Sequence, residues 1–315
     1  MRTHLTTSPD EAASYIRRGR IVAFPTETVY GLGADARRVA AVRSIFDAKG
    51  RPSDNPLIVH IADPAQAAEL AACIPPAART LMDAFWPGPL TVILPKSDAV
   101  PSLVTAGLDT VGVRCPGHAV ATAFLRSCQA PVAAPSANRS GRPSPTTWEA
   151  VREDLGGRIP CILKGGRTEA GLESTVVDCT EAVPVVLRPG AIPEEALADA
   201  LPEIGVEPPG GDAAAKSPGT RHRHYAPRAR VTLVAEPGEA VASADAAYIG
   251  LRAPDEPESF ATVRIAPSVE AYAHDLFHFF RACDREEAAV ICAQLVPEDG
   301  LGRALNDRLR RAAAG

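Results

Sequence analysis

The sequence predicts an α/β fold with a larger first part and a smaller second part. Short apolar runs rich in β-branched residues, such as 57–61, alternate along the chain with segments that carry helix-start and helix-stop signals. The 315 residues, 46% of them hydrophobic and 23% charged, are enough for two hydrophobic cores. Residues 208–216 are rich in Pro, Gly and Ala, which is typical of a linker. We therefore predict domains over 1–207 and 229–315, joined by a linker over 208–228.

Composition excludes several classes of protein. The net charge of −5 argues against a globally basic nucleic-acid binder, although a local cluster of cations is compatible with it. The sequence contains no apolar run of the roughly 20 residues that a membrane span needs and no signal-peptide pattern, so a cytoplasmic protein is expected. The seven cysteines form no Cys-x-x-Cys pair, and we expect them to be reduced and mostly buried.

The first elements surround a polar strand end. A helix is expected to begin after Ser8, with Pro9 in its first turn, and to end at Gly19. The strand that follows, 20–24, ends in Pro25-Thr26-Glu27-Thr28, and hydroxyls with a carboxylate at the end of a strand suit a crevice site. Gly31 and Gly33 are expected to let the chain turn closely before a helix over 37–48.

The stretch 48–61 carries the clearest chemistry. Lys49 and Arg51 flank Gly50, which permits a tight helix exit, and Pro52 prevents the helix from continuing. Two cations held at a chain reversal suit an anion. The following strand contains one strongly polar residue, His60, which we expect to have a functional or hydrogen-bonded partner.

The remaining elements follow from similar signals. Arg114 ends a strand; it is either a surface charge or a planar, bidentate donor to a carboxylate. The loop 139–145 mixes small hydroxyl residues, Gly and two arginines, so it is either a phosphate-binding loop or a solvated one. Further helices are expected from 63, 75, 146 and 193 and over 268–283 and 302–313, and further strands over 90–94, 110–114, 131–134, 174–178, 185–188, 231–235, 246–251 and 288–292.

Two motifs argue against other kinds of site. The segment 166–171 has the first half of a P-loop spacing, but it continues Leu172-Glu173-Ser174 where a lysine followed by Ser or Thr is required. His222 and His224 have no neighbouring cysteine or carboxylate cluster, so we expect no metal ligands there. Any phosphate site must therefore use another cradle.

Several blocks, in order, resemble the YrdC/Sua5 family. They cover roughly the first two thirds of the chain, and the ordered set is specific although each block alone is weak. They are PTETVYGLG (25–33), KGRP followed by NPLIVH (49–60), FWPGPLT (85–91), TAGLDTVGVR (105–114), APSANRSGRPSPT (134–146), GLESTVV (171–177), LRPG (187–190) and SPGTRHRHYAP (217–227).

The resemblance implies a twisted open mixed sheet followed by a small Rossmann-like domain. It implies synthesis of threonylcarbamoyl-adenylate from L-threonine, bicarbonate or CO2, and ATP, with release of pyrophosphate, for N6-threonylcarbamoyladenosine modification of tRNA. Mg²⁺ is expected with the ATP, held by phosphate oxygens with few or no protein ligands. Handover of the product to the tRNA threonylcarbamoyl-transferase is a further expectation, and direct tRNA binding is left open.

The resemblance also implies site residues. It assigns L-threonine to Thr28, His60, Arg114, Ser136 and Ser174. It assigns ATP to Lys49, Arg51, Asn55, Thr110, Ala134 through its backbone, Ser144, Arg188 and Tyr225, with Lys49 and Arg51 as the catalytic cations. Segment 217–227 is expected to act as a lid anchored by the C-terminal domain, although Thr220 and His222 stand where relatives often carry Met and Tyr.

Two other functions fit parts of the sequence. A YrdC-like cationic concavity could hold an RNA backbone, which makes an RNA-binding module one alternative. A carbamoyl-transfer enzyme of the hydrogenase-maturation type is the other, since a YrdC-like domain forms one part of such enzymes. The lack of Cys-x-x-Cys pairs counts against the second, because that enzyme is expected to carry zinc-finger segments.

Overall fold

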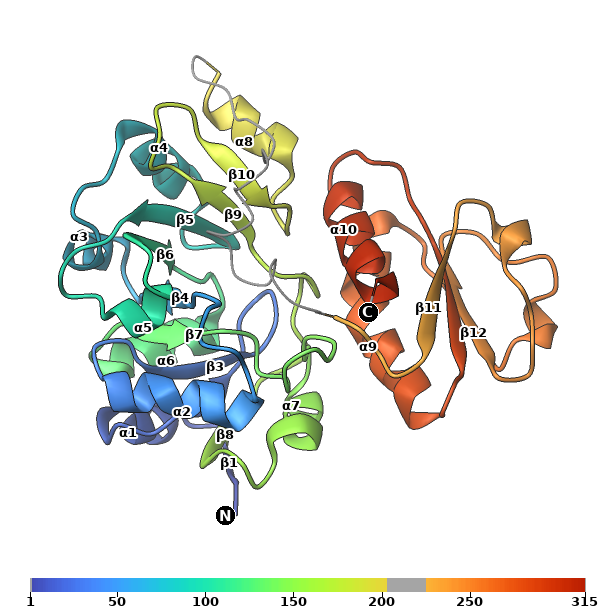
Figure 1. Cartoon of the computed structure of the whole chain (residues 1–315), viewed down its shortest axis with the longest axis horizontal. Coiled ribbons are helices and arrows are strands. Elements are labelled where there is room, and N and C mark those ends of the chain that lie inside the picture. Colours follow the sequence, from blue (N-terminus) through green and yellow to red (C-terminus); the bar gives the residue numbers. More distant parts are fainter. Residues whose placement is uncertain (1, 203–224, 315) are drawn as a thin grey trace.

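The computed structural model describes residues 2–202 and 225–314 and contains two sheets (Figure 1). The large sheet is mixed and has ten strands. In spatial order they are β1 (His4–Thr6), β8 (Cys161–Leu163), β2 (Val22–Phe24), β3 (Gly31–Asp35), β7 (Val132–Ala134), β4 (Ile58–His60), β6 (Thr110–Arg114), β5 (Leu90–Pro95), β9 (Thr175–Asp178) and β10 (Val185–Arg188). Its helices are α1 (Pro9–Arg17), α2 (Val39–Lys49), α3 (Ala67–Leu70), α4 (Pro76–Phe85), α5 (Ser102–Thr105), α6 (Ala119–Cys128), α7 (Trp148–Leu155) and α8 (Glu194–Ala200).

The smaller sheet has four parallel strands in the order β11 (Arg230–Val234), β14 (Val290–Gln294), β12 (Ala246–Gly250) and β13 (Thr262–Ile265). Helices α9 (Val269–Arg285) and α10 (Gly302–Ala313) lie on the side that faces the large sheet (Figure 1). The apolar stripe of α9, including Leu276 and Phe280, is fully buried. The mixed sheet and the separate parallel sheet confirm the predicted α/β class. Most of the predicted linker and lid, including Thr220, His222 and His224, lies outside the described residues.

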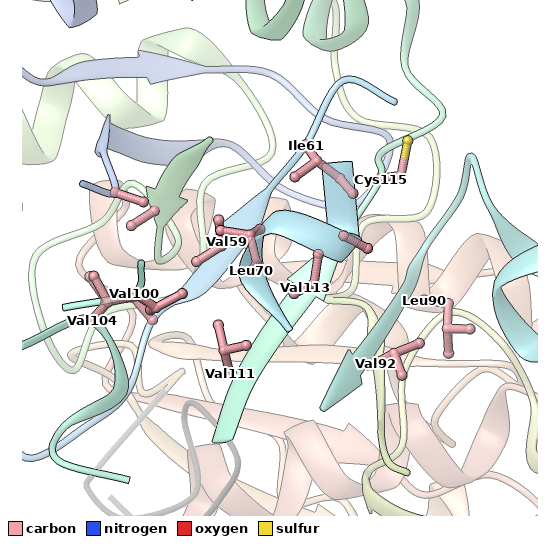
Figure 2. Close-up of a cluster of buried hydrophobic side chains, with 14 of the residues drawn as sticks. Val59, Ile61, Leu70, Leu90, Val92, Val100, Val104, Val111, Val113 and Cys115 are labelled. Carbon is pink, nitrogen blue, oxygen red and sulfur yellow. The ribbon is translucent and has the colours of Figure 1, made fainter. Parts of the chain in front are cut away.

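Alternation along β4 and β6 separates a core face from a polar face. Val59, Val111 and Val113 point into a cluster of fully or nearly fully buried apolar side chains, shown in Figure 2. Because successive side chains in a strand point to opposite faces, His60 and Arg114 lie on the other face. The apolar residues therefore fix the register that presents the two polar ones.

The predicted turn at Gly31 and Gly33 is wrong, because both residues belong to strand β3, which pairs with β2 and β7. A Cβ atom at Gly33 would lie 2.6 Å from Val132 Cγ1 and 3.0 Å from Phe24 Cε1. The glycine is needed because the side chains of neighbouring strands cross it closely, and not because the chain turns.

Other differences from the sequence prediction are local. Helix α7 takes Thr147 rather than Thr146 as its N-cap, with the Thr147 hydroxyl accepting from the Ala150 amide at 3.3 Å. Helix α6, whose N-cap is His118, was not predicted, because histidine is not among the usual capping residues. The short strands β1, β8 and β13, each of three or four residues, were not predicted either.

Two further findings concern the cysteines and the helices. None of the seven cysteines forms a disulfide, and six are buried while Cys73 is exposed. Among the described residues, no helix is both long and apolar enough to cross a membrane.

Candidate functional site

A cavity of about 60 Å³ lies over the polar face of the large sheet. Its walls come from the 26–31 segment, both ends of β4, the carboxyl ends of β6, β7 and β10, the residues just before β9, and Arg51 after α2. Tyr225, the first described residue after the gap, also lines it. Segments far apart in the sequence therefore meet at one small cavity.

Arg114 reaches the cavity from the end of β6. Its Nη1 donates to Thr28 Oγ1 at 2.9 Å, and its Nε donates to the Gly88 carbonyl at 3.3 Å. Its Nη2 lies 2.8 Å from Glu27 Oε1 without the geometry of a hydrogen bond, and Glu27 Oε2 has no hydrogen-bond partner within the described ranges. Burial opposes ionisation of Glu27, but the charge and contact of Arg114 outweigh it and hold the pKa of Glu27 below its usual range. A positive side chain is thus fixed at the wall by a buried carboxylate.

His60 lies beside Arg114, because β4 and β6 run parallel and the two residues are partners in register. Its ring and that of Phe24 lie edge to face, with 5.8 Å between ring centroids. Burial, helped by the charge of Arg114, lowers the pKa of His60 to about 3. His60 is therefore neutral at physiological pH, and its Nδ1 has no hydrogen-bond partner in the part of the chain that the structure describes.

The two predicted catalytic cations diverge at the end of α2, where Gly50 adopts φ 62° as expected of a helix exit. Arg51 lines the cavity, its Nη2 donates to the Pro56 carbonyl at 3.2 Å, and burial lowers its pKa to about 10. Lys49 Nζ instead donates to the carbonyl of Ser136, at 2.6 Å, and to that of Asn138. Burial, together with the charge of Arg51, holds the pKa of Lys49 well below its usual value.

The hydroxyl groups of two serines in the cavity wall are held by hydrogen bonds. Ser136 Oγ donates to Asn138 Oδ1 at 2.6 Å. Ser174 Oγ lies 2.8 Å from Thr91 Oγ1, and Arg188 Nη2 donates to the Ser174 carbonyl at 2.9 Å. The serine side chains are thus positioned before any ligand arrives.

Nine of the predicted site residues line the cavity. All five residues assigned to threonine do so: Thr28, His60, Arg114, Ser136 and Ser174. So do four of the residues assigned to ATP: Arg51, Ala134, Arg188 and Tyr225. Lys49, Asn55, Thr110 and Ser144 do not line it. Their roles, like those of the lining residues, stay predictions.

Besides Lys49, described above, three predicted residues lie outside the cavity lining. Ser144 is separated from it by one hydrogen bond, since its hydroxyl donates to the cavity-lining Glu173 at 2.5 Å. The carbonyl of Asn55 accepts from Arg51 Nη2 at 3.4 Å. Thr110 begins β6, at the end of the strand opposite Arg114.

Two charged residues of this site were not predicted from the sequence, whereas Glu27 lies at the strand end that suggested a crevice site. Glu173 lies inside the block GLESTVV, which could have drawn attention to it. Arg308 comes from α10, pairs with Glu173 at 2.7 Å and lies over the Tyr225 ring at 5.1 Å from its centroid. It belongs to no motif, so only the fold could reveal it.

The arrangement is suited to binding anions. Three buried arginines, Arg51, Arg114 and Arg188, share the wall with hydroxyl groups and a neutral imidazole. Within the described ranges, no group of three or more His, Cys, Asp or Glu side chains is placed to hold a metal ion. The wall offers fixed donors for carboxylate and phosphate oxygens, so its chemistry would be alignment and charge neutralisation.

Comparison with known proteins accounts for both parts of the chain. A family model for Sua5, YciO and YrdC proteins, described as "Telomere recombination", matches residues 14–190. A second model, described as the C-terminal domain of threonylcarbamoyl-AMP synthase, matches residues 192–314.

Individual relatives align over nearly the whole chain. A threonylcarbamoyl-AMP synthase of Pyrococcus abyssi is 47% identical, over 96% of this chain and 93% of its own length. One of Bacillus subtilis is 43% identical, over 97% of this chain and 92% of its own. The crystal structure of P. abyssi Sua5 complexed with L-threonine has a TM-score of 0.91 at 43% identity, covering 99% of this chain and 98% of that one. The chain therefore belongs to the Sua5/YciO/YrdC family, in the form that carries the additional C-terminal domain.

Proposed function

We propose that the protein is an L-threonylcarbamoyladenylate synthase, which condenses L-threonine, bicarbonate or CO2, and ATP and releases pyrophosphate. The relatives named for this activity align over nearly the full chain at 43% and 47% identity, which favours it over an RNA-binding module or a hydrogenase-maturation enzyme. The observation that carries the proposal is the cavity wall, where a carboxylate-binding arginine, hydroxyl groups and two further arginines converge.

In this reaction the threonine amine first combines with bicarbonate to give a carbamate and water. A carbamate oxygen then attacks the α-phosphorus of ATP, and pyrophosphate leaves. The substrates supply both nucleophile and leaving group, so the protein must align them and stabilise the charge. Arg114 would face the threonine carboxylate, and Thr28, Ser136 and Ser174 offer hydroxyls to its amine and side chain. Arg51 and Arg188 would take the phosphates.

Mg²⁺ fits this wall only as a partner of ATP. The cavity-lining Glu173 and the nearby Glu27 are paired with arginines, Arg308 and Arg114, whose positive charges oppose the binding of a cation there. Phosphate oxygens would therefore be the main ligands of Mg²⁺, with few or no ligands from the protein. The metal would neutralise part of the phosphate charge, and Arg51 and Arg188 would neutralise the remainder.

We also propose how bicarbonate enters, where the product goes and how the two domains share the work. Bicarbonate or CO2 would enter between the amine and the α-phosphate. The product is a reactive acyl-adenylate, so direct handover to the tRNA threonylcarbamoyl-transferase in the cytoplasm would limit its hydrolysis. The proposed division of labour places the chemistry in residues 1–207 and assigns support to residues 229–315.

The test is pyrophosphate release in the presence of ATP, threonine, bicarbonate and Mg²⁺, with each component omitted in turn. We expect release to require all of them, and valine to replace threonine poorly because it leaves buried hydroxyl partners unpaired. Pyrophosphate release that continues without threonine would overturn the proposal. Equal turnover of valine and threonine would overturn the assigned hydroxyl pocket.

A further inference from the structure

Two arginines of the C-terminal domain are buried against the large domain. Arg281 of α9 has a side chain 7% exposed, and that of Arg308 of α10 is 0% exposed. Each meets a buried carboxylate of the large domain: Arg281 Nη2 lies 2.8 Å from Asp154 Oδ2, and Arg308 Nε lies 2.7 Å from Glu173 Oε2. Arginines are rarely buried unless they are paired, so these contacts have a specific structural purpose.

The first pair holds one part of the loop 139–145. Asp154 also accepts from the backbone amide of Arg139 at 3.2 Å and from Arg142 Nη1 at 2.7 Å. Arg281 itself donates to the carbonyl of Pro143. One guanidinium from α9 thus fixes this loop both directly and through the carboxylate that the loop binds.

The second pair holds the end of the same loop. Ser144 Oγ donates to Glu173 Oε1 at 2.5 Å, and Arg308 engages the other oxygen of that carboxylate. Arg308 also donates to the Pro189 carbonyl at 3.0 Å and stands over the ring of Tyr225. Glu173 and Tyr225 both line the cavity. The guanidinium therefore sits directly behind the cavity wall.

The ionised forms of both carboxylates are stabilised by these two arginines. Burial alone would favour their neutral forms, yet the charges and hydrogen bonds of the arginines outweigh it and hold the pKa of Asp154 and that of Glu173 below their usual ranges. Removing an arginine would leave a buried carboxylate short of its partner, and the loop would lose the group that fixes it.

We propose that Arg281 and Arg308 are positioning residues that hold the loop 139–145 and Glu173 in place for nucleotide binding. The inference rests on the proposed function, in which Ser144 of that loop serves ATP. Thr28, His60 and Arg114, assigned to threonine, are not hydrogen-bonded to either arginine in the described structure. Loss of either arginine should therefore weaken ATP binding selectively. A general loss of structure would affect both substrates.

The experiment compares Arg281→Met and Arg308→Met with Arg303→Met. Arg303 also joins the two domains, through Glu194 and Glu195 of α8, but these residues do not line the cavity. We expect at least a tenfold rise in the KM for ATP and in the Kd for ATP by calorimetry, with the KM for threonine within about twofold. Arg303→Met should stay within about twofold on every constant. Arg281→Lys and Arg308→Lys should recover part of the ATP affinity, because they restore the positive charge.

Unchanged ATP constants in folded variants would overturn the inference, and so would equal losses for ATP and threonine. If a methionine variant does not fold, the corresponding lysine variant is judged by the same criterion, with a smaller but ATP-selective loss expected. The proposed function is tested separately, by threonine-dependent pyrophosphate release in the unaltered protein. If that release is absent, the calorimetric ATP affinities still decide whether the two arginines position the nucleotide side.

Discussion

Individual polar residues at this site are held by partners that sequence alone does not reveal. A histidine in an apolar strand and an arginine at a strand end could be recognised in the sequence as candidates, because buried polar groups require hydrogen-bond or charged partners. The residues that surround them in the fold could not be predicted. The low pKa of His60 depends on Phe24 covering its ring and on Arg114 standing beside it, and both contacts arise from strand pairing.

His60 should make stability depend on pH. Its pKa of about 3 in the folded protein lies below the ordinary value of about 6.5, so the unfolded chain binds a proton that the folded protein does not. The contribution of neutral His60 to the free energy of unfolding is therefore fully present above about pH 6.5. It decreases as the pH falls towards 3. Between pH 7.5 and pH 5, the loss due to His60 should be about 2 kcal/mol.

Urea unfolding of the unaltered protein and of His60→Gln at both pH values measures this effect. The variant should lose about 2 kcal/mol less than the unaltered protein over this interval, because glutamine does not titrate. The other titrating groups are common to both proteins and largely cancel. A parallel pH dependence in the two proteins would show that His60 is accessible to protons when folded.

Arg51 should contribute directly to ATP affinity. It lines the cavity, and its Nε has no hydrogen-bond partner within the described ranges. A charge-assisted bond to phosphate is worth about 1.5–3 kcal/mol, so Arg51→Met should weaken ATP binding roughly 10- to 150-fold. Calorimetry with Arg43→Met provides the matched control, because Arg43 is an exposed arginine of α2, the helix that ends just before Arg51. Unchanged affinity in a folded Arg51→Met variant would remove Arg51 from the nucleotide site.

Elements with strong local signals were predicted well, and those defined by their neighbours were not. The strand β6 and the helix α10 were placed with their observed bounds, because alternation in the one and amphipathic spacing in the other are intrinsic to the segment. Strand β3 was taken for a turn, since glycine is common in turns and the crossing side chains of Phe24 and Val132 cannot be read from the sequence.

The close approach at β3 predicts the effect of adding one methyl group. In Gly33→Ala the new Cβ would lie 2.6 Å from Val132 Cγ1, so the strands must move apart or the valine must shift. Overpacking of this kind costs about 1–3 kcal/mol in the free energy of unfolding. Chemical denaturation measures the loss. Gly166→Ala is the matched control, because its Cβ meets nothing within 4 Å and its change in stability should be small.

At the scale of the whole molecule, the sequence predicted two layered α/β parts but not how they join. The joining residues, Arg281 and Arg308, lie on helices whose amphipathic pattern gives no reason to expect cations on a buried face. Their burial is explained by the ion pairs that they form with Asp154 and Glu173. Contacts between distant segments carry no local signature, so the site's support was missed although most of its lining was predicted.

The two domains should unfold together near neutral pH. If the C-terminal domain unfolded alone, Asp154 and Glu173 would lose their partners Arg281 and Arg308, and breaking one buried pair costs about 3–5 kcal/mol. The stacking of Tyr225 on Phe277, with 5.4 Å between ring centroids, would be lost as well. Differential scanning calorimetry at pH 7.5 should therefore show one transition, with equal calorimetric and van't Hoff enthalpies.

Acid should uncouple the two domains. Asp154 and Glu173 have pKa values lowered by folding, so their stabilising contribution is present above the unfolded values of about 4 and is lost as the pH falls through the folded values. We expect the single transition to separate into two as the pH is lowered from about 5 to 3. The double variant Arg281→Met and Arg308→Met should show two transitions already at pH 7.5, while Arg303→Met keeps one. Two transitions in the unaltered protein at neutral pH would contradict this coupling, because the buried pairs would then be too weak to join the domains.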